Sequence, residues 1–253
     1  GRHVREVNAN PFLTVSEETI RSVEADVVTQ DIEGVTVHVA SPCKKTRSTS
    51  SRIYIDIHGG AFVSGGGNLA RLRAARGAAD LDCICYGVDY RMPPEHPYPA
   101  PLDDCIAVYE AVVRRHPTTR PIVGGVSAGG ALVAALALRV RDEARAPAPL
   151  AAILLSPALD LTASGDTFET NRYIDVVLRT SGERYGQIYA GGHDLNHPYL
   201  SPLFGDFARG FPPTLLQSGT RDILLSNAVR MQRALCGAGV PVEETSLSYA
   251  DFE

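Results

Sequence analysis

The sequence has few of the features that mark specialised classes of protein. Its 253 residues contain no tryptophan and only two methionines. No apolar run approaches the roughly 20 residues that a membrane-spanning helix needs, so no membrane span is expected. Basic residues do not cluster, and 24 Lys and Arg against 29 Asp and Glu give a formal net charge of −5. Because nucleic acids and anionic membranes bind a concentrated positive field, neither partner is expected.

The cysteines form no bridging or metal-binding pattern. Their number is odd, and no Cys-x-x-Cys pair is present, so we expect buried free thiols. Free thiols favour a reducing compartment, where disulfides do not persist. The first residues are polar and charged and lack the apolar core of a secretory signal, so a cytoplasmic location is expected. The five cysteines are Cys43, Cys83, Cys85, Cys105 and Cys236.

Short β-branched or apolar runs alternate with helical patterns from about residue 35 onward. This alternation predicts an α/β domain with a mostly parallel sheet flanked by helices. The helix over 128–141 is apolar on nearly all sides and is therefore expected in the middle of the domain. Strands are predicted over 35–40, 53–57, 84–88, 122–124, 151–155, 214–217 and 242–249, and helices over 69–79, 102–115, 128–141 and 226–236.

Two segments, 1–34 and 161–200, do not follow the alternation. An excursion of about 40 residues inside one domain usually forms a lid or cap. The second segment contains His193 and His197, whose i, i+4 spacing is that of helical metal ligands. Gly191, Gly192 and Pro198 disfavour a helix there, so no metal site is expected.

The segment 125–130 reads Gly-Val-Ser-Ala-Gly-Gly and lies between a predicted strand and the apolar helix. In the Gly-x-Ser-x-Gly motif, small residues flank a serine that occupies a strained turn between strand and helix. The helix N-terminus places backbone N–H groups beside the hydroxyl, where they favour developing negative charge. A plain structural turn is the alternative, but this context favours Ser127 as a nucleophile.

A second glycine-rich turn follows the predicted strand over 53–57 and contains His58, Gly59 and Gly60. Backbone N–H groups aimed at one oxygen stabilise the oxyanion of acyl transfer. Gly59 and Gly60 can turn their amides inward because they carry no side chain, and Ala128 would add a third amide. We expect His58 to orient this loop through hydrogen bonds, since a general base belongs on the other side of the serine.

Asp222 comes shortly after the predicted strand over 214–217. A carboxylate at the end of a parallel strand lies at the ligand-binding edge of an open sheet. It can accept the Nδ1–H of a histidine and stabilise the imidazolium. The alternatives are an exposed aspartate or a cap of the next helix, and the chain order of Ser127 and Asp222 favours an orienting acid.

Together these motifs resemble the hormone-sensitive-lipase-like family of α/β-hydrolases, carboxylesterases that carry a His-Gly-Gly loop before the nucleophile elbow. The resemblance extends from about Ile53 to Asp222 and includes 89–100 (DYRMPPEHPYPA), Asp103-Asp104, 155–161 (LSPALDL) and Ser201-Pro202-Leu203. Two departures are Val126, where many members have an acidic residue or threonine, and Ala61, which replaces the third loop glycine.

The resemblance implies a single α/β-hydrolase domain over 1–253, with about eight strands and a small cap built from 1–34 and 161–200. It also implies short-chain acyl esters or lactones as small-molecule substrates, and no cofactor. The oligomeric state is left open, a homodimer included.

No histidine follows Asp222, although the triad of this family runs Ser, Asp, His along the chain. We expect the catalytic histidine and a closing helix beyond Glu253. One alternative is a non-catalytic small-molecule receptor on the same fold, because removing the base costs about 10⁶-fold in turnover and leaves the pocket. Another is an amidase or deacetylase, which would share the triad.

Overall fold

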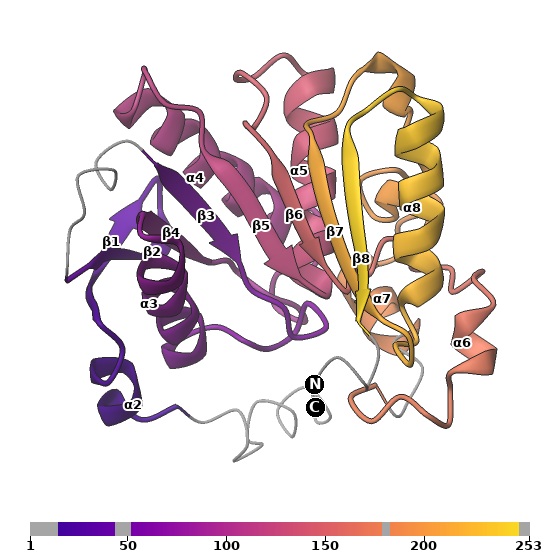
Figure 1. The fold of residues 1–253 in the computed structure, drawn as a ribbon, viewed down its shortest axis with the longest axis horizontal. Helices are drawn as coiled ribbons and strands as arrows, with labels where there is room; N and C mark the ends of the chain where they lie inside the picture. Colours follow the sequence, from indigo (N-terminus) through magenta and orange to yellow (C-terminus); the bar gives the residue numbers. More distant parts are fainter. Residues whose placement is uncertain (1–14, 44–51, 179–182, 248–253) are drawn as a thin grey trace.

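Eight strands form one sheet in the order β1-β2-β4-β3-β5-β6-β7-β8 (Figure 1). The computed structural model describes residues 15–43, 52–178 and 183–247. The strands are β1 (Ala25–Ile32), β2 (Val35–Pro42), β3 (Ile53–Ile57), β4 (Ile84–Asp89), β5 (Ile122–Val126), β6 (Ala152–Leu155), β7 (Thr214–Gly219) and β8 (Val242–Leu247). The α-helices are α2 (Glu17–Arg21), α3 (Asn68–Leu81), α4 (Ala100–Arg115), α5 (Ala128–Asp142), α6 (Thr167–Thr170), α7 (Glu183–Ala190) and α8 (Leu225–Gly237), and two 3₁₀ turns are η3 (Pro202–Phe204) and η4 (Phe207–Arg209).

The sheet is mostly parallel. Only β1–β2 and β2–β4 pair antiparallel, and β4, β3, β5, β6, β7 and β8 run parallel to one another. This topology confirms the predicted α/β-hydrolase fold with eight strands. Each predicted strand and helix is present with ends that differ by a few residues, although residues 248 and 249 of the last predicted strand lie outside the described residues.

The prediction that residues 1–34 belong to a cap is wrong for Ala25–Ile32, which form the edge strand β1. Along β1 only Ile32 is buried, and most other positions are exposed. β1 lies at the edge of the sheet with most of its residues exposed to solvent. A strand in that position does not need alternating apolar residues, so the hydrophobic pattern did not predict β1. The assignment of the remainder of 1–34 to a cap stays a prediction.

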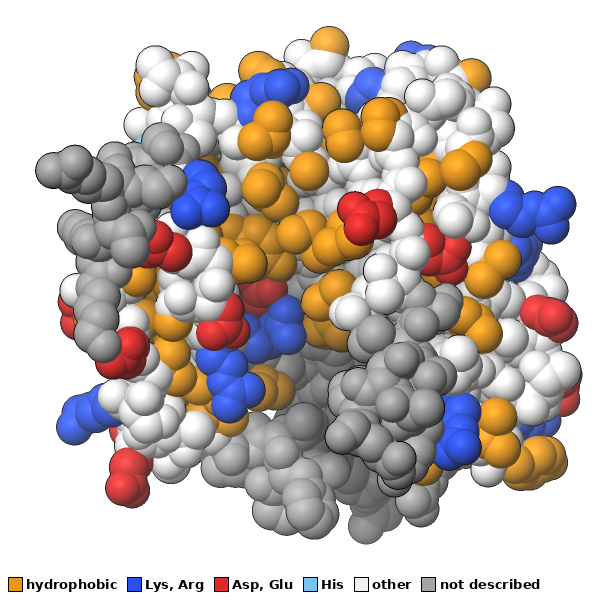
Figure 2. All heavy atoms as spheres, in the orientation of Figure 1, with side chains coloured by type: hydrophobic (Ala, Val, Ile, Leu, Met, Phe, Trp, Pro, Cys, Tyr) orange, Lys and Arg blue, Asp and Glu red, His pale blue; other side chains and the backbone are white. Residues whose placement is uncertain are grey.

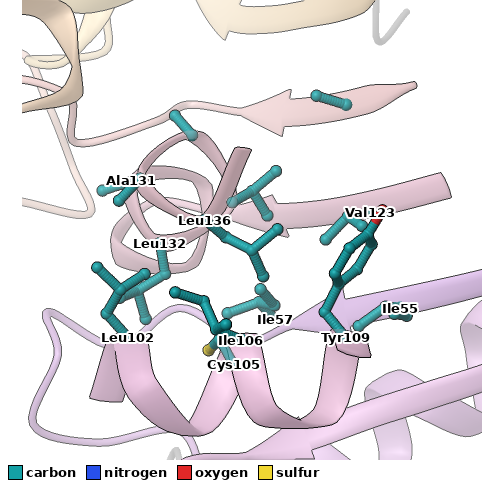
Figure 3. Packing of buried hydrophobic residues seen from close by; sticks show 14 of the residues in the cluster. Ile55, Ile57, Leu102, Cys105, Ile106, Tyr109, Val123, Ala131, Leu132 and Leu136 are labelled. Atoms are coloured by element: carbon teal, nitrogen blue, oxygen red, sulfur yellow. The ribbon is translucent and has the colours of Figure 1, made fainter. Parts of the chain in front are cut away.

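Helices cover both faces of the sheet. Side chains alternate between the faces of a strand, and in β3 Tyr54 packs with α3 while Ile55 belongs to the larger cluster. That larger cluster lies between the sheet, α4 and α5, and twelve of the fifteen α5 residues are buried, as predicted for the middle helix. Figure 3 shows part of it, with Leu102, Cys105, Ile106 and Tyr109 of α4 beside Ala131, Leu132 and Leu136 of α5 and Ile55, Ile57 and Val123 of the sheet.

The segment 161–200 contains α6 and α7, which lie near the carboxyl ends of the strands (Figure 1). Its role as a cap stays a prediction. His193 and His197 lie in turns and not in a helix, as the flanking glycines and proline predict. Within the described ranges, no group of three or more His, Cys, Asp or Glu could hold a metal ion.

The cysteines and the surface agree with the sequence in part. All five cysteines are free, but Cys43 and Cys236 are exposed, so the expectation that every thiol is buried is wrong for these two. Cys43 follows the end of β2, and Cys236 lies near the end of α8, where neither is enclosed by the sheet.

Among the described helices, none has the length and apolar character needed to cross a membrane. On the face drawn in Figure 2, acidic and basic side chains are interspersed.

Candidate active site

Ser127 occupies the turn between β5 and α5 with φ 55° and ψ −118°, a backbone conformation that residues with a side chain avoid. Neighbouring backbone groups hold this turn. The Ser127 N–H donates to the carbonyl of Leu155 at 2.8 Å, and the Ser127 carbonyl accepts from the N–H of Ala158 at 3.1 Å. Hydrogen bonds to β6 and to the residues that follow it therefore stabilise the strained turn. Its side chain is half-buried and accepts or donates no hydrogen bond within the described part of the chain.

The two glycines of the motif are required by close backbone contacts. A Cβ on Gly125 would stand 2.6 Å from the carbonyl carbon of Gly129, and a Cβ on Gly129 would stand 2.0 Å from the oxygen of Ile57. Side-chain atoms essentially never approach backbone so closely. The elbow is thus pressed against the end of β3, which brings the next loop to the serine.

That loop contains the predicted oxyanion amides. A Cβ on Gly59 would stand 2.7 Å from the oxygen of Val126, and Gly60 has φ +115°. No hydrogen bond among the described residues uses the N–H of Gly59, Gly60 or Ala128. These amides lie on the loop and at the first residue of α5, on the two sides of Ser127. Ala61, at the position of the third loop glycine, adopts φ 53°, so this departure is accommodated in a left-handed conformation.

His58 is buried behind this loop and holds it. Its Nδ1 donates to the Gly59 carbonyl at 2.7 Å, and its ring stacks on Tyr90 with centroids 4.1 Å apart. The Tyr90 hydroxyl donates to the His58 carbonyl at 2.9 Å. Burial lowers the pKa of His58, and the Gly59 carbonyl and Asp89 oppose that shift less strongly. A neutral ring that bonds its own loop fits the predicted orienting role. Tyr90 stands in the motif over 89–100, but its contact with His58 was not predicted.

Asp222 lies three residues beyond β7 and is half-buried. Its Oδ1 accepts from the N–H of Leu224 at 2.8 Å, and its Oδ2 accepts from the hydroxyl of Ser218 at 3.3 Å. The bond to Leu224 is a local turn of the kind aspartates form with the backbone two residues on, and it fixes the carboxylate. α8 itself begins after Leu224 and has no side-chain cap, so the alternative that Asp222 caps this helix is not supported. Ser218 was not predicted, although it stands in the same Ser-Gly-Thr-Arg-Asp run.

Ser127 and Asp222 line the same cavity of about 700 Å³. Its walls include Ser218 and the apolar residues Val176 and Val177 from the segment 161–200. A second cavity of about 50 Å³ also reaches Ser127 and extends between the elbow and α7. Its lining is mostly apolar and includes Ala61, Phe62, Ala128, Leu161, Phe168, Leu178 and Leu224.

The described histidines do not complete the arrangement. Hydrogen bonds of His38, His58, His116, His193 and His197 run to groups other than Ser127 and Asp222. The predicted position of the base, beyond Glu253, is outside the described residues. The structure therefore brings the predicted serine, acid and loop together and leaves the base as a prediction.

The chain resembles known hydrolases in sequence. Residues 54–249 match the model of the alpha/beta hydrolase fold family. The chain is 34% identical over 212 residues to an acetyl-hydrolase from Streptomyces hygroscopicus, which covers 81% of this chain and 69% of that protein. It is 33% identical over 201 residues to an esterase from Acinetobacter venetianus, covering 78% of this chain and 66% of that protein. The chain thus spans about two thirds of the length of these relatives.

Solved structures of esterases are also similar to this chain. One crystal structure of an esterase superposes with a TM-score of 0.88 at 32% identity, covering 98% of this chain and 76% of that chain. An esterase from the bacterial hormone-sensitive lipase family superposes with a TM-score of 0.82 at 28% identity, covering 97% and 85%. The chain therefore belongs to the alpha/beta hydrolase fold family, and within it to the hormone-sensitive-lipase-like group of carboxylesterases that its motifs predict.

Proposed function

We propose that this protein is a serine carboxylesterase in which Ser127 attacks the acyl carbon of the substrate. The observation that supports this most strongly is the placement of Ser127 in a strained turn, in one cavity with Asp222 and beside backbone amides that no described residue accepts from. We expect a hydroxyl in that position to lie beside the amides of Gly59, Gly60 and Ala128, which would bind the oxyanion of the tetrahedral intermediate.

A serine hydroxyl needs a base to accept its proton, and we assign this role to a histidine C-terminal to Glu253. Asp222 would accept the Nδ1–H of that histidine and stabilise its charged form. His58 would hold the oxyanion loop without exchanging protons with substrate. The reaction would then pass through an acyl-enzyme on Ser127, which water hydrolyses with the same histidine as base.

The two cavities at Ser127 suggest how an ester would bind. The smaller one, about 50 Å³ and mostly apolar, suits a short acyl chain better than a long one. The larger cavity would take the alcohol part of the ester. Short-chain acyl esters are therefore the proposed substrates, and lactones are proposed from the family resemblance alone.

The test is hydrolysis of p-nitrophenyl acetate by the protein expressed from its complete reading frame. We expect turnover, labelling of Ser127 by a fluorophosphonate, and loss of about 10⁶-fold in kcat in Ser127→Ala. Unchanged activity in Ser127→Ala would refute the assignment. A small molecule bound without any fluorophosphonate labelling would favour a receptor, and amide hydrolysis faster than hydrolysis of the matched ester would favour an amidase.

A further inference from the structure

Three buried polar side chains of the segment 161–200 bond the loop that carries Asp222. They are Thr167, Asn171 and Asp175, with exposed fractions of 8%, 7% and 8%. The Asn171 side-chain amide donates to the carbonyl of Asp222 at 2.8 Å and to that of Thr220 at 3.3 Å. The backbone of Asp222 is thus bonded directly by a side chain 51 positions earlier in the sequence.

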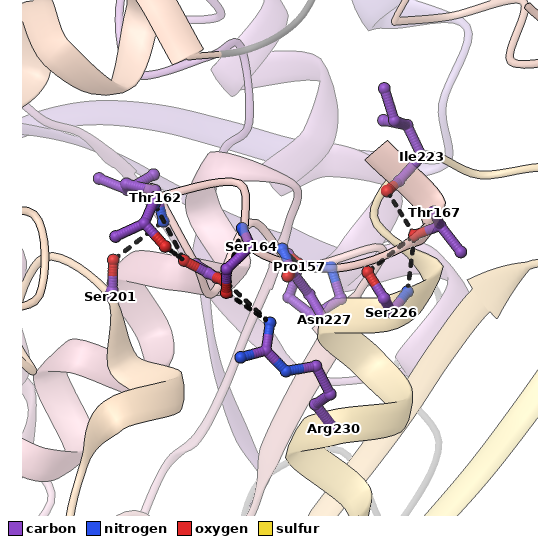
Figure 4. A network of polar contacts seen from close by, with 11 residues as sticks. Pro157, Thr162, Ser164, Thr167, Ser201, Ile223, Ser226, Asn227 and Arg230 are labelled. Atoms are coloured by element: carbon purple, nitrogen blue, oxygen red, sulfur yellow. Dashed lines mark hydrogen bonds and ion pairs between the residues drawn. The ribbon is translucent and has the colours of Figure 1, made fainter. Parts of the chain in front are cut away.

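Thr167 bonds the same loop from its other side. Its Oγ1 lies 2.8 Å from the carbonyl oxygen of Ile223, to which it donates, and it accepts from the N–H of Ser226 at 3.0 Å (Figure 4). It also lies 2.8 Å from the hydroxyl of Ser226. This one hydroxyl therefore joins α6 to both the residue after Asp222 and the first turn of α8.

The Asp175 carboxylate connects two walls of the large cavity. Its Oδ2 accepts from the N–H of Ile223 at 2.8 Å. Its Oδ1 accepts from the N–H groups of Val177 and Leu178 at 2.7 and 2.8 Å. Because Val177 and Leu178 line the cavity with Asp222, a single carboxylate holds both the loop of Asp222 and these apolar lining residues.

These bonds matter because parts of both walls are exposed to solvent. Thr220 and Arg221 are exposed, and Val176 and Val177 on the apolar wall are 76% and 83% exposed. Exposed backbone with few packed neighbours opens easily. Bonds from Ser218 and Leu224 hold the carboxylate within its own loop. The bonds to Asn171 and Asp175 tie that loop to the segment 161–200.

We propose that Asn171, Thr167 and Asp175 are positioning residues for Asp222, and that Asp175 also sets the apolar wall against which the ester binds. This inference rests on the proposed function, in which Asp222 orients a histidine base and stabilises its protonated form. An error of about 1 Å in a catalytic group can cost about 10²-fold in rate. A displaced carboxylate also stabilises the imidazolium less, which lowers the pKa of the base.

The experiment compares Asn171→Ala, Thr167→Val and Asp175→Asn in the complete protein, using pH profiles of kcat/KM for p-nitrophenyl acetate and hexanoate. In all three we expect kcat to fall about tenfold or more and the acid limb of the profile to move to lower pH by about half a unit to one unit. Leu178, whose N–H bonds Asp175, also lines the small cavity assigned to the acyl chain. Asp175→Asn should therefore in addition raise KM for the hexanoate more than for the acetate. Thr167→Ser, which keeps the hydroxyl, should restore the profile.

Controls separate this role from folding and from the proposed function. Asp206→Asn alters a carboxylate that also accepts a backbone N–H, that of Ala208, and should leave the profile unchanged. Urea midpoints identify any variant that does not fold. If Asp175→Asn does not fold, the pH profiles of Asn171→Ala and Thr167→Val test the proposal. Variants with an unshifted acid limb and kcat within threefold of the parent would overturn the proposal, provided that Asp222→Asn is inactive. If Asp222→Asn stays active, the proposed function itself fails.

Discussion

The backbone oxygen of Ile57 lies where a side chain on Gly129 would have to stand, 2.0 Å from the ideal Cβ position. This contact joins the end of β3 to the first turn of α5 and holds the loop of Gly59 and Gly60, which follows β3, close to Ser127. α5 cannot move away from the end of β3, because it is buried along nearly its whole length between the sheet and α4.

Gly129→Ala should therefore destabilise the protein. We expect a loss of about 3 kcal/mol in the free energy of unfolding, the upper end of the usual cost of overpacking, since backbone and not a flexible side chain must move. Urea denaturation measures it. The matched control is Gly237→Ala at the end of α8, where nothing lies within 4 Å of the new methyl group. Its stability should stay the same or rise slightly. Equal midpoints for the two variants would contradict the close packing of the elbow.

Stability should decrease as pH falls below about 6.5, in part through His58. Burial lowers the pKa of His58 in the folded protein, while in the unfolded chain it titrates near 6.5. Below that pH the unfolded chain binds a proton that the folded protein does not, so the free energy of unfolding falls by up to about 1.4 kcal/mol per pH unit.

Urea unfolding between pH 5 and 7 checks this dependence. His58→Gln should show a flatter decline than the parent protein. The control Tyr90→Phe removes the hydroxyl bond to the His58 carbonyl and should lose about 1 kcal/mol equally at each pH. If the parent and His58→Gln declined in parallel, the folded protein would not be holding His58 neutral.

Asp160, at the start of the segment 161–200, should be a strong local anchor. Its carboxylate is buried and accepts hydrogen bonds from Thr162, Ser164 and Arg230 (Figure 4). Burial opposes its ionisation, but the bonds from Ser164, Thr162 and Arg230 outweigh burial and lower the pKa of Asp160.

Asp160→Asn should thus reduce the free energy of unfolding at pH 7 by about 3 kcal/mol. Both oxygens of the carboxylate accept hydrogen bonds, but the amide of asparagine has one acceptor oxygen, so some donors would lose their acceptor. Asp206→Asn offers the comparison, since Asn caps a helical turn as well as Asp does. Chemical denaturation of both variants gives the difference. A loss in Asp160→Asn no greater than in Asp206→Asn would show that the network does not anchor the segment.

Phe168 borders the small cavity beside Ser127, and its truncation should change acyl-chain preference. In Phe168→Ala we expect the ratio of kcat/KM for p-nitrophenyl hexanoate to that for the acetate to rise about tenfold, as each added methylene gains an apolar contact. Phe204→Ala, which removes a partly exposed ring outside both cavities, should keep the parent ratio. An unchanged ratio in Phe168→Ala would mean that the acyl chain binds elsewhere.

Much of the site could be predicted because its chemistry lies in short continuous segments. Gly125, Ser127 and Gly129 stand within five residues, and the His58–Gly60 turn and Asp222 each follow a strand that its apolar residues reveal. Parallel strands bring their carboxyl ends to one edge, so the order of the strands was enough to expect these groups together.

The sequence by itself thus determined the alternation of strands and helices and the strained serine turn, and it favoured Asp222 as the acid of the proposed mechanism. Only the tertiary structure decided that Ala25–Ile32 joins the sheet, since an edge strand with an exposed face needs no apolar pattern. It also decided that Tyr90 stacks on His58 and that Asp175 holds the residue after Asp222, 48 positions away. Polar contacts between distant segments leave no periodicity in the chain, because each depends on the packing of the whole fold.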